Sequence, residues 1–243
     1  MAQPEPEHSP SGNPIYRPGD PNPFAPPGGA DHLEEITDHV QRWIGGVEAV
    51  FHELVSDTVH LDVLHVPPSD VRPCHVLVTC GMSDLPMQVP PDADVPRHLE
   101  LMTTLPPDWQ VSDAAFRNQR WYWPVGLMKF MARYPHKYNT WLGWGHSMPN
   151  GDPPQPLGPG TRLCGAVLLP TVSFAEEFHE LGIPGGPVIQ FLSLIPVYRE
   201  EMELKLREGV DSLMDRFDEH GINDLIQPDR PNAPARARQF GRF

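Results

Sequence analysis

Residues 121–154 read WYWPVGLMKFMARYPHKYNTWLGWGHSMPNGDPP and contain four of the chain's six Trp and three of its five Tyr. So much aromatic area has to be buried in a core or offered to a partner. Apolar residues recur at helical spacing between Pro124 and Pro135, which indicates a helix. Pro124 suits its first turn, and Pro135 is expected to end it. An extended segment at 140–145 is expected to lead to a tight turn at Asn150–Gly151. The stretch predicts a helix, an aromatic strand and an ordered turn.

The flanking sequence predicts further strands and helices. Alternating or continuous apolar runs indicate strands at 59–66, 75–80, 98–105, 163–169 and 187–195, the last apolar enough to lie centrally in a sheet. Helical spacing indicates a helix from Asp31 to about Leu54, interrupted at Gly45–Gly46, and a closing helix at 197–220. The closing helix is expected to point the pairs Glu201–Lys205 and Glu203–Arg207 outward and to end at Gly221. This order predicts an α+β fold: a mixed or antiparallel sheet of about five or more strands with helices packed on it.

Composition divides the chain into three parts. Residues 1–30 hold nine Pro and four Gly without an apolar period, which is typical of a disordered arm. Residues 31–228 are long enough for one domain with its own core. Residues 229–243 carry Arg230, Arg236, Arg238 and Arg242 and are expected to be a flexible tail.

The chain is acidic, with a formal net charge of −14. An acidic body repels phosphate backbones, so nucleic-acid binding is not expected, whereas a basic protein partner is favoured. Many soluble proteins are acidic without such a partner, and that alternative stays open. The longest apolar-rich run is too short to span a membrane, and the start lacks the features of a signal peptide, so we expect a cytoplasmic protein.

Five segments resemble, in order, the suppressor of fused domain family in its bacterial form. They are the stretch at 121–154 together with 75–87 (HVLVTCGMSDLPM), 98–109 (HLELMTTLPPDW), 165–170 (GAVLLP) and 188–217 (VIQFLSLIPVYREEMELKLREGVDSLMDRF). The resemblance implies an α+β fold and covers only the family's amino-terminal module. The second, partner-clasping domain of the animal proteins has no counterpart in the remaining residues.

The resemblance implies a protein-binding function. Animal members restrain a zinc-finger transcription factor in Hedgehog signalling, and bacterial members are inferred to be immunity proteins that neutralise polymorphic toxins. We therefore expect a non-catalytic module that binds a protein partner such as a basic toxin domain.

The alternative is a hydrolase or metal-dependent enzyme that uses His and Asp residues near His146 and Asp152. Residues 145–149 begin like the nucleophile elbow G-x-S-x-G around Ser147, but Pro149 stands where a small residue is needed and no helix can follow at once. The twelve His and three Cys show no metal-ligand spacing, so neither a metal nor a cofactor is expected. Glu100 lies among apolar residues and could serve as an acid or base, although a solvent-facing position on an alternating strand is favoured.

The candidate binding surface lies at the end of the aromatic stretch. Trp141 and Trp144 are three residues apart on a predicted strand, so they should point to opposite faces. An exposed ring beside an acidic body suits a basic partner, since the ring supplies buried contact and the carboxylates speed encounter. The predicted surface comprises Trp144, His146, Asn150 and Asp152, with the Asp84 loop alongside. In the competing interpretation both Trp are core residues, more so for Trp141, and the turn only closes a hairpin.

Overall fold

The computed structural model describes residues 7–15, 17, 30–52, 59–91 and 93–233. An eight-stranded mixed sheet forms its centre, in the order β3–β4–β5–β6–β10–β8–β7, with β9 paired to the start of β10. The strands are β3 (Ala49–Phe51), β4 (Asp62–Val66), β5 (His75–Cys80), β6 (His98–Leu105), β7 (Ser147–Pro149), β8 (Gly165–Leu169), β9 (Glu180–Gly182) and β10 (Val188–Val197). The predicted α+β class with a mixed sheet is confirmed.

Strand β10 organises the sheet. It pairs in parallel with β6, with Ile189 opposite His98 and Ser193 opposite Met102, while the other strand pairs are antiparallel. Its other edge is shared by β9 and β8. The predicted central position of this apolar strand is confirmed.

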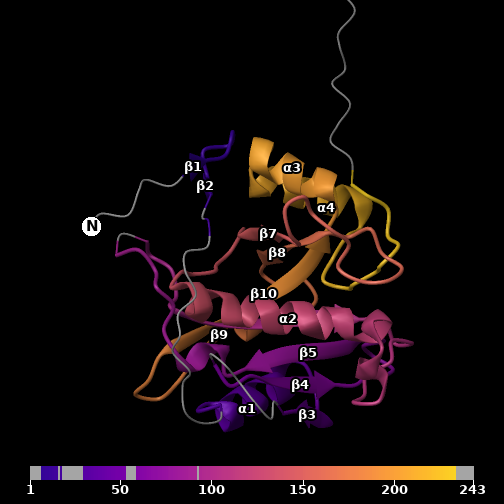
Figure 1. Ribbon diagram of the computed structural model, residues 1–243. Helices are drawn as coiled ribbons and strands as arrows, with labels where there is room; N and C mark the ends of the chain where they lie inside the picture. Colours follow the sequence, from indigo (N-terminus) through magenta and orange to yellow (C-terminus); the bar gives the residue numbers. More distant parts are fainter. Residues whose placement is uncertain (1–6, 16, 18–29, 53–58, 92, 234–243) are drawn as a thin grey trace, which may run out of the picture.

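Helices cover both faces of the sheet (Figure 1). Helix α2 (Gln119–Tyr138) packs on one face, where Leu192 and Leu194 of β10 join its core cluster. On the other face, α1 (Leu33–Trp43) packs near Phe191, while α3 (Arg199–Glu208) and α4 (Val210–His220) pack near Ile195. Within the described part of the chain, no helix is long and apolar enough to cross a membrane.

Helix α2 is longer than predicted. It begins after Asn118, whose side chain accepts a hydrogen bond from the N–H of Arg120 at 2.9 Å, and it ends at Asn139 in the left-handed conformation. Pro124 is therefore not in the first turn, and Pro135 does not end the helix. Both prolines are buried, so their packing against the core offsets the backbone hydrogen bonds that they cannot make.

Three other predicted elements differ from the structure. Residues 140–145 are irregular, and the strand that follows them, β7, begins only at Ser147. The first helix ends at Trp43, and 49–51 form strand β3 because they pair with β4. The closing helix is two helices, since Gly209 has φ of 94° and cannot continue an α-helix.

The segments expected to be an arm and a tail are partly ordered. In the amino-terminal segment, β1 (Glu7–His8) pairs with β2 (Pro14–Ile15), and the N–H of Ser11 donates to the carbonyl of Leu206 at 3.1 Å. In the carboxy-terminal segment, Arg230 is only 7% exposed and bonds to Glu201, which is fully buried. The predicted flexible tail is therefore wrong for Arg230, and the predicted outward pair of Glu201 with Lys205 is wrong as well. The physical reason is that the buried Glu201 carboxylate requires a cationic partner, which Arg230 supplies. Residues 1–6, 16, 18–29 and 234–243 lie outside the described residues.

Candidate functional site

The predicted binding surface centres on a short turn that joins α2 to β7. Strand β8 holds this turn, because the N–H of Gly145 donates to the carbonyl of Leu168 at 2.8 Å and the N–H of Leu168 donates to the carbonyl of His146 at 2.9 Å. Gly145 also packs on Val210, since a Cβ at this glycine would lie 3.4 Å from that side chain. The turn is therefore fixed beside the start of α4.

The two Trp of the turn occupy different environments. Trp144 is 48% exposed, whereas Trp141 is half-buried and packs against the core cluster under α2. The interpretation that both rings are core residues is wrong for Trp144. Strand alternation predicted that the two rings would point to opposite sides. They do, but the cause is an irregular turn, which directs the Trp141 ring inward and leaves the Trp144 ring outside.

His146 supports the turn from within. Its ring lies 4.2 Å from the Trp141 ring, centroid to centroid. Burial, together with the positive charge of Lys205, lowers the pKa of His146 to about 4. The imidazole is therefore neutral at physiological pH and acts as a packing group rather than as a charged contact.

Asn150 and Asp152 lie on the loop after β7. The side-chain amide of Asn150 donates to the carbonyls of Gln155 and Pro156 at 2.9 and 3.0 Å, so it shapes the loop. The Asp152 side chain is exposed. Of these two residues, Asp152 is the one that offers its polar group outward.

Asp84 lies at another place in the fold. It ends the short helix η1 (Met82–Asp84), and its two carboxylate oxygens accept the N–H of Asp31 at 3.1 and 3.2 Å, next to the start of α1. The loop after Asp84 does reach the aromatic segment, since the N–H of Gln88 donates to the carbonyl of Thr140 at 3.0 Å. The loop, rather than the Asp84 carboxylate, approaches the residues that lead into Trp144.

The Asp84 carboxyl group should make stability depend on pH. Burial, reinforced by the charges of Glu100, Asp31 and Asp62, raises its pKa to about 7 despite the bond from Asp31. Because this value exceeds the ordinary 3.8, the group favours the fold at low pH and loses that contribution as pH rises through about 7. Relative to Asp84→Asn, the wild-type protein should lose about 1 kcal/mol between pH 4 and pH 8, allowing for solvent screening. Urea unfolding of both proteins across this range tests the prediction; parallel curves would contradict it.

The position of Glu100 differs from the one that the sequence favoured. Glu100, expected to face solvent, is fully buried in β6 and accepts four hydrogen bonds, from Thr79, Gly81 and twice from Ser83. Burial raises its pKa, although the four donors oppose that change. Since the donors occupy both oxygens, Glu100 organises the backbone around η1 and is not presented to a substrate. The apolar neighbours of Glu100 and the Gly81–Asp84 turn directly after β5 are the sequence signals of this buried position.

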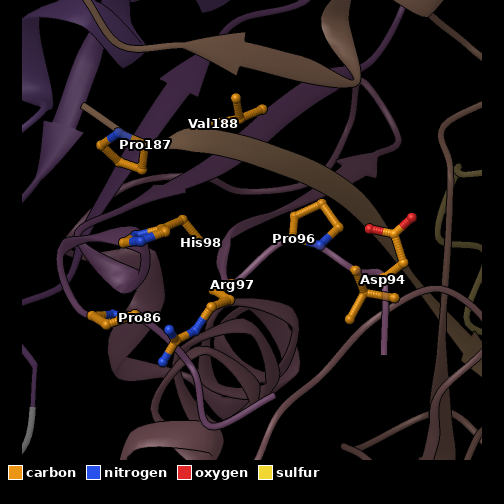
Figure 2. Close-up of a pocket in the computed structure, with 8 residues that line it drawn as sticks. Pro86, Asp94, Pro96, Arg97, His98, Pro187 and Val188 are labelled. Atoms are coloured by element: carbon orange, nitrogen blue, oxygen red, sulfur yellow. The ribbon is translucent and has the colours of Figure 1, made fainter. Parts of the chain in front are cut away.

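A shallow groove opens where β6 and β10 begin (Figure 2). It encloses about 560 Å³ and is lined by Pro86, Asp94, Val95, Pro96, Arg97, His98, Pro187 and Val188. Its polar groups serve the fold: Nε of Arg97 donates to the Met87 carbonyl at 3.3 Å, and Nδ1 of His98 bonds the Ser83 carbonyl at 2.7 Å. Asp94 points away from both in Figure 2. The groove therefore lacks the convergent polar groups of a catalytic pocket.

The residues that resembled a hydrolase site do not form one. Ser147 lies in β7 opposite Val167, not on a sharp turn from a strand to a helix. Among the residues that the structure describes, no three His, Cys, Asp or Glu side chains form a group that could hold a metal ion.

Comparisons with known proteins identify relatives of this fold. The family model for the suppressor of fused protein (SUFU) matches residues 57–231. A SUFU homologue from Neisseria gonorrhoeae FA 1090 superposes with a TM-score of 0.64 at 15% identity, over 86% of this chain and 100% of that chain. The Sufu–Fu complex structure gives a TM-score of 0.58 at 16% identity, over 85% and 93% of the two chains. Drosophila Suppressor of Fused gives 0.57 at 14% identity, over 82% of this chain and 50% of that chain. No curated protein sequence matches the chain.

Proposed function

Because the chain belongs to the suppressor of fused family, as its five resembling segments predicted, we propose that it is a non-catalytic module that binds another protein. We propose further that this partner is a basic toxin domain, which the chain neutralises as an immunity protein. A protein partner is supported by the Sufu–Fu complex, in which a protein of the same fold is solved together with Fu.

The exposed ring of Trp144 carries this proposal. A large aromatic side chain that is 48% exposed costs hydration free energy unless a partner covers it, and Trp is the side chain most enriched among residues that dominate binding energy. The turn that holds Trp144 is pinned to β8 and packed on Val210, so little ordering entropy would be lost on binding.

The helix that starts beside the Trp144 turn carries negative charge, which a basic partner requires, while the positive charge of Lys205 acts on His146 in the same turn. Helix α4 starts beside the turn and carries exposed carboxylates at Asp211, Asp215 and Asp218. Such carboxylates at the rim of an interface increase the association rate of a positively charged partner, while the ring at its centre slows dissociation. Asp152, exposed on the neighbouring loop, would extend the same acidic rim.

Replacing Trp144 with Ala should abolish most of the affinity for the partner without unfolding the protein. An immunity gene is expected to adjoin the gene of a large secreted toxin, and the probe is then the carboxy-terminal domain of that toxin. Loss of a central aromatic contact should weaken binding by about 2 kcal/mol, or roughly thirtyfold, in calorimetry.

Two control variants sharpen this test. Trp144→Phe keeps a ring and should retain most of the affinity, and Val188→Ala removes another exposed apolar side chain and should retain all of it. If Trp144→Ala unfolds the protein, the ring belongs to the core. A folded Trp144→Ala that binds normally would remove this surface from the proposal, and the absence of an adjoining toxin gene would remove the immunity role.

A further inference from the structure

The segment that contains helix α2 is positively charged, whereas the molecule as a whole is acidic. Between Asp113 and Asp152 the sequence contains no Asp or Glu but five basic residues, Arg117, Arg120, Lys129, Arg133 and Lys137. With a total of −14, the remaining residues carry −14 − 5 = −19. The uninterrupted positive segment includes the whole of α2 and stands apart from an otherwise acidic chain.

The carboxy-terminal half of α2 carries two side-by-side stripes. Phe130, Tyr134 and Tyr138 follow one another at i, i+4 and i+8, with ring centroids 6.0 and 4.8 Å apart along the row. The basic residues of the same half, Lys129, Arg133 and Lys137, have the same spacing one residue earlier. Side chains at this spacing form a row along the helix, so an aromatic row about 12 Å long runs beside a basic one.

These stripes lie away from the sheet. Met128, Met131 and Ala132 of the same turns are fully buried, whereas helical geometry places Phe130 and Lys137 on the opposite side. Apart from Phe130, the residues of the two stripes are partly exposed. Phe130 is 50% exposed, and α2 runs across the near side of the sheet in Figure 1. The outer side of the helix therefore presents aromatic area next to positive charge.

Charge narrows the choice of occupant. A second copy that used the same face would place two basic rows against each other, which is unfavourable. A long polyanion such as nucleic acid would be repelled by the −19 on the remaining residues as soon as it extended beyond the helix. A short segment of another protein avoids both problems when it combines carboxylates for the basic row with apolar side chains for the rings.

We propose that the outer face of α2, formed by Phe130, Tyr134, Tyr138, Lys129, Arg133 and Lys137, binds an acidic segment of a partner protein that also carries apolar side chains. This surface is independent of Trp144 and of the toxin proposal. It requires an acidic ligand, whereas the proposed toxin is basic, and its test uses neither a Trp144 variant nor a toxin.

The test measures binding of a fluorescein-labelled peptide composed of Glu and Leu to the full-length protein by fluorescence anisotropy. The same peptide with Lys in place of Glu, and an oligothymidylate of equal charge, are measured in parallel. The Glu peptide should bind most tightly, and added salt should weaken its binding. Lys137→Glu and Phe130→Ser should each weaken it by about tenfold. Arg42→Glu makes the same change of charge on the exposed side of α1 and should leave binding unchanged.

Thermal unfolding of each variant separates lost binding from lost structure. Because Phe130 and Lys137 lie on the outer side of the helix, their variants should melt with the wild-type protein. Equal binding of the two peptides, no binding of either, or an unchanged affinity of Lys137→Glu would each overturn the proposal. Tighter binding of the oligothymidylate would assign the face to nucleic acid instead, and a wild-type dimer that Phe130→Ser abolishes would assign it to a second copy.

Discussion

Replacing Arg230 with Ala is expected to destabilise the protein by about 3–5 kcal/mol, because it leaves a buried carboxylate without its cation. The two terminal guanidinium nitrogens of Arg230, Nη1 and Nη2, donate to the two oxygens of Glu201 at 2.7 and 2.6 Å, in a bidentate pair. Arg230 is 7% exposed and Glu201 is fully buried, so water cannot take over the role of the lost partner.

The contacts around this pair explain why losing Arg230 would weaken neighbouring elements as well. Glu201 also accepts the N–H groups of Tyr198 and Ala233, both at 2.9 Å, and Arg230 donates to the carbonyl of Pro196 at 3.0 Å. The pair therefore joins the end of β10, the start of α3 and the segment at 229–233. Truncation after residue 228 should be as harmful as Arg230→Ala, which differs from the expectation that residues 229–243 form a flexible tail.

Chemical denaturation of wild type, Arg230→Ala and the double variant Glu201→Met/Arg230→Met measures this effect. The double variant should recover much of the loss, since replacing both charges by apolar side chains leaves no buried ion unpaired. Arg199→Ala removes an arginine that pairs with Glu203 at the surface, where both side chains are more than half exposed, and it should change stability by less than about 1 kcal/mol. An Arg230→Ala protein as stable as Arg199→Ala would show that the Glu201 carboxylate tolerates isolation.

The sequence predicted those parts of the fold that depend on local pattern. The bounds of β5 and β6 agree with the predicted strands, because apolar alternation and the flanking Gly81 and Pro106 define them locally. Leu99, Leu101 and Leu105 share one core cluster, as a period of two requires. The resemblance to the suppressor of fused family implied the same α+β class.

The features that were missed depend on contacts between distant residues. The i,i+4 spacing predicted that Glu201 would point outward and pair with Lys205, but its partner is Arg230. Helical periodicity carries no information about a contact between residues so far apart in the sequence. Glu100 looked solvent-facing because its donors come from the turn after β5, which only the paired sheet brings within reach. The exposure of Trp144 was expected from strand alternation, yet it results from an irregular turn whose geometry β8 determines.

Replacing Glu100 with Leu should cost about 3–5 kcal/mol, since each buried donor left without an acceptor costs about 1–3 kcal/mol. One oxygen of Glu100 accepts the N–H groups of Gly81 and Ser83, both at 2.9 Å, and the Ser83 hydroxyl at 2.6 Å. The other oxygen accepts the Thr79 hydroxyl at 2.6 Å. Gly81 has φ of 112°, and a Cβ there would lie 2.2 Å from the carbonyl oxygen of His60, so the backbone cannot easily rearrange to find other acceptors.

Glu100→Gln is the matched control, because it keeps one oxygen in place for the two N–H groups and should cost only about 1 kcal/mol. It also tests the sign of the pH dependence. Burial raises the pKa of Glu100 above its ordinary 4.5, so the wild-type protein loses stability as pH rises from that value, whereas Glu100→Gln does not titrate. The stability gap between wild type and Glu100→Gln, measured by urea unfolding, should therefore narrow as pH rises. Equal costs for Leu and Gln would contradict the hydrogen-bonding account, and a gap that widens with pH would show that the four donors outweigh burial.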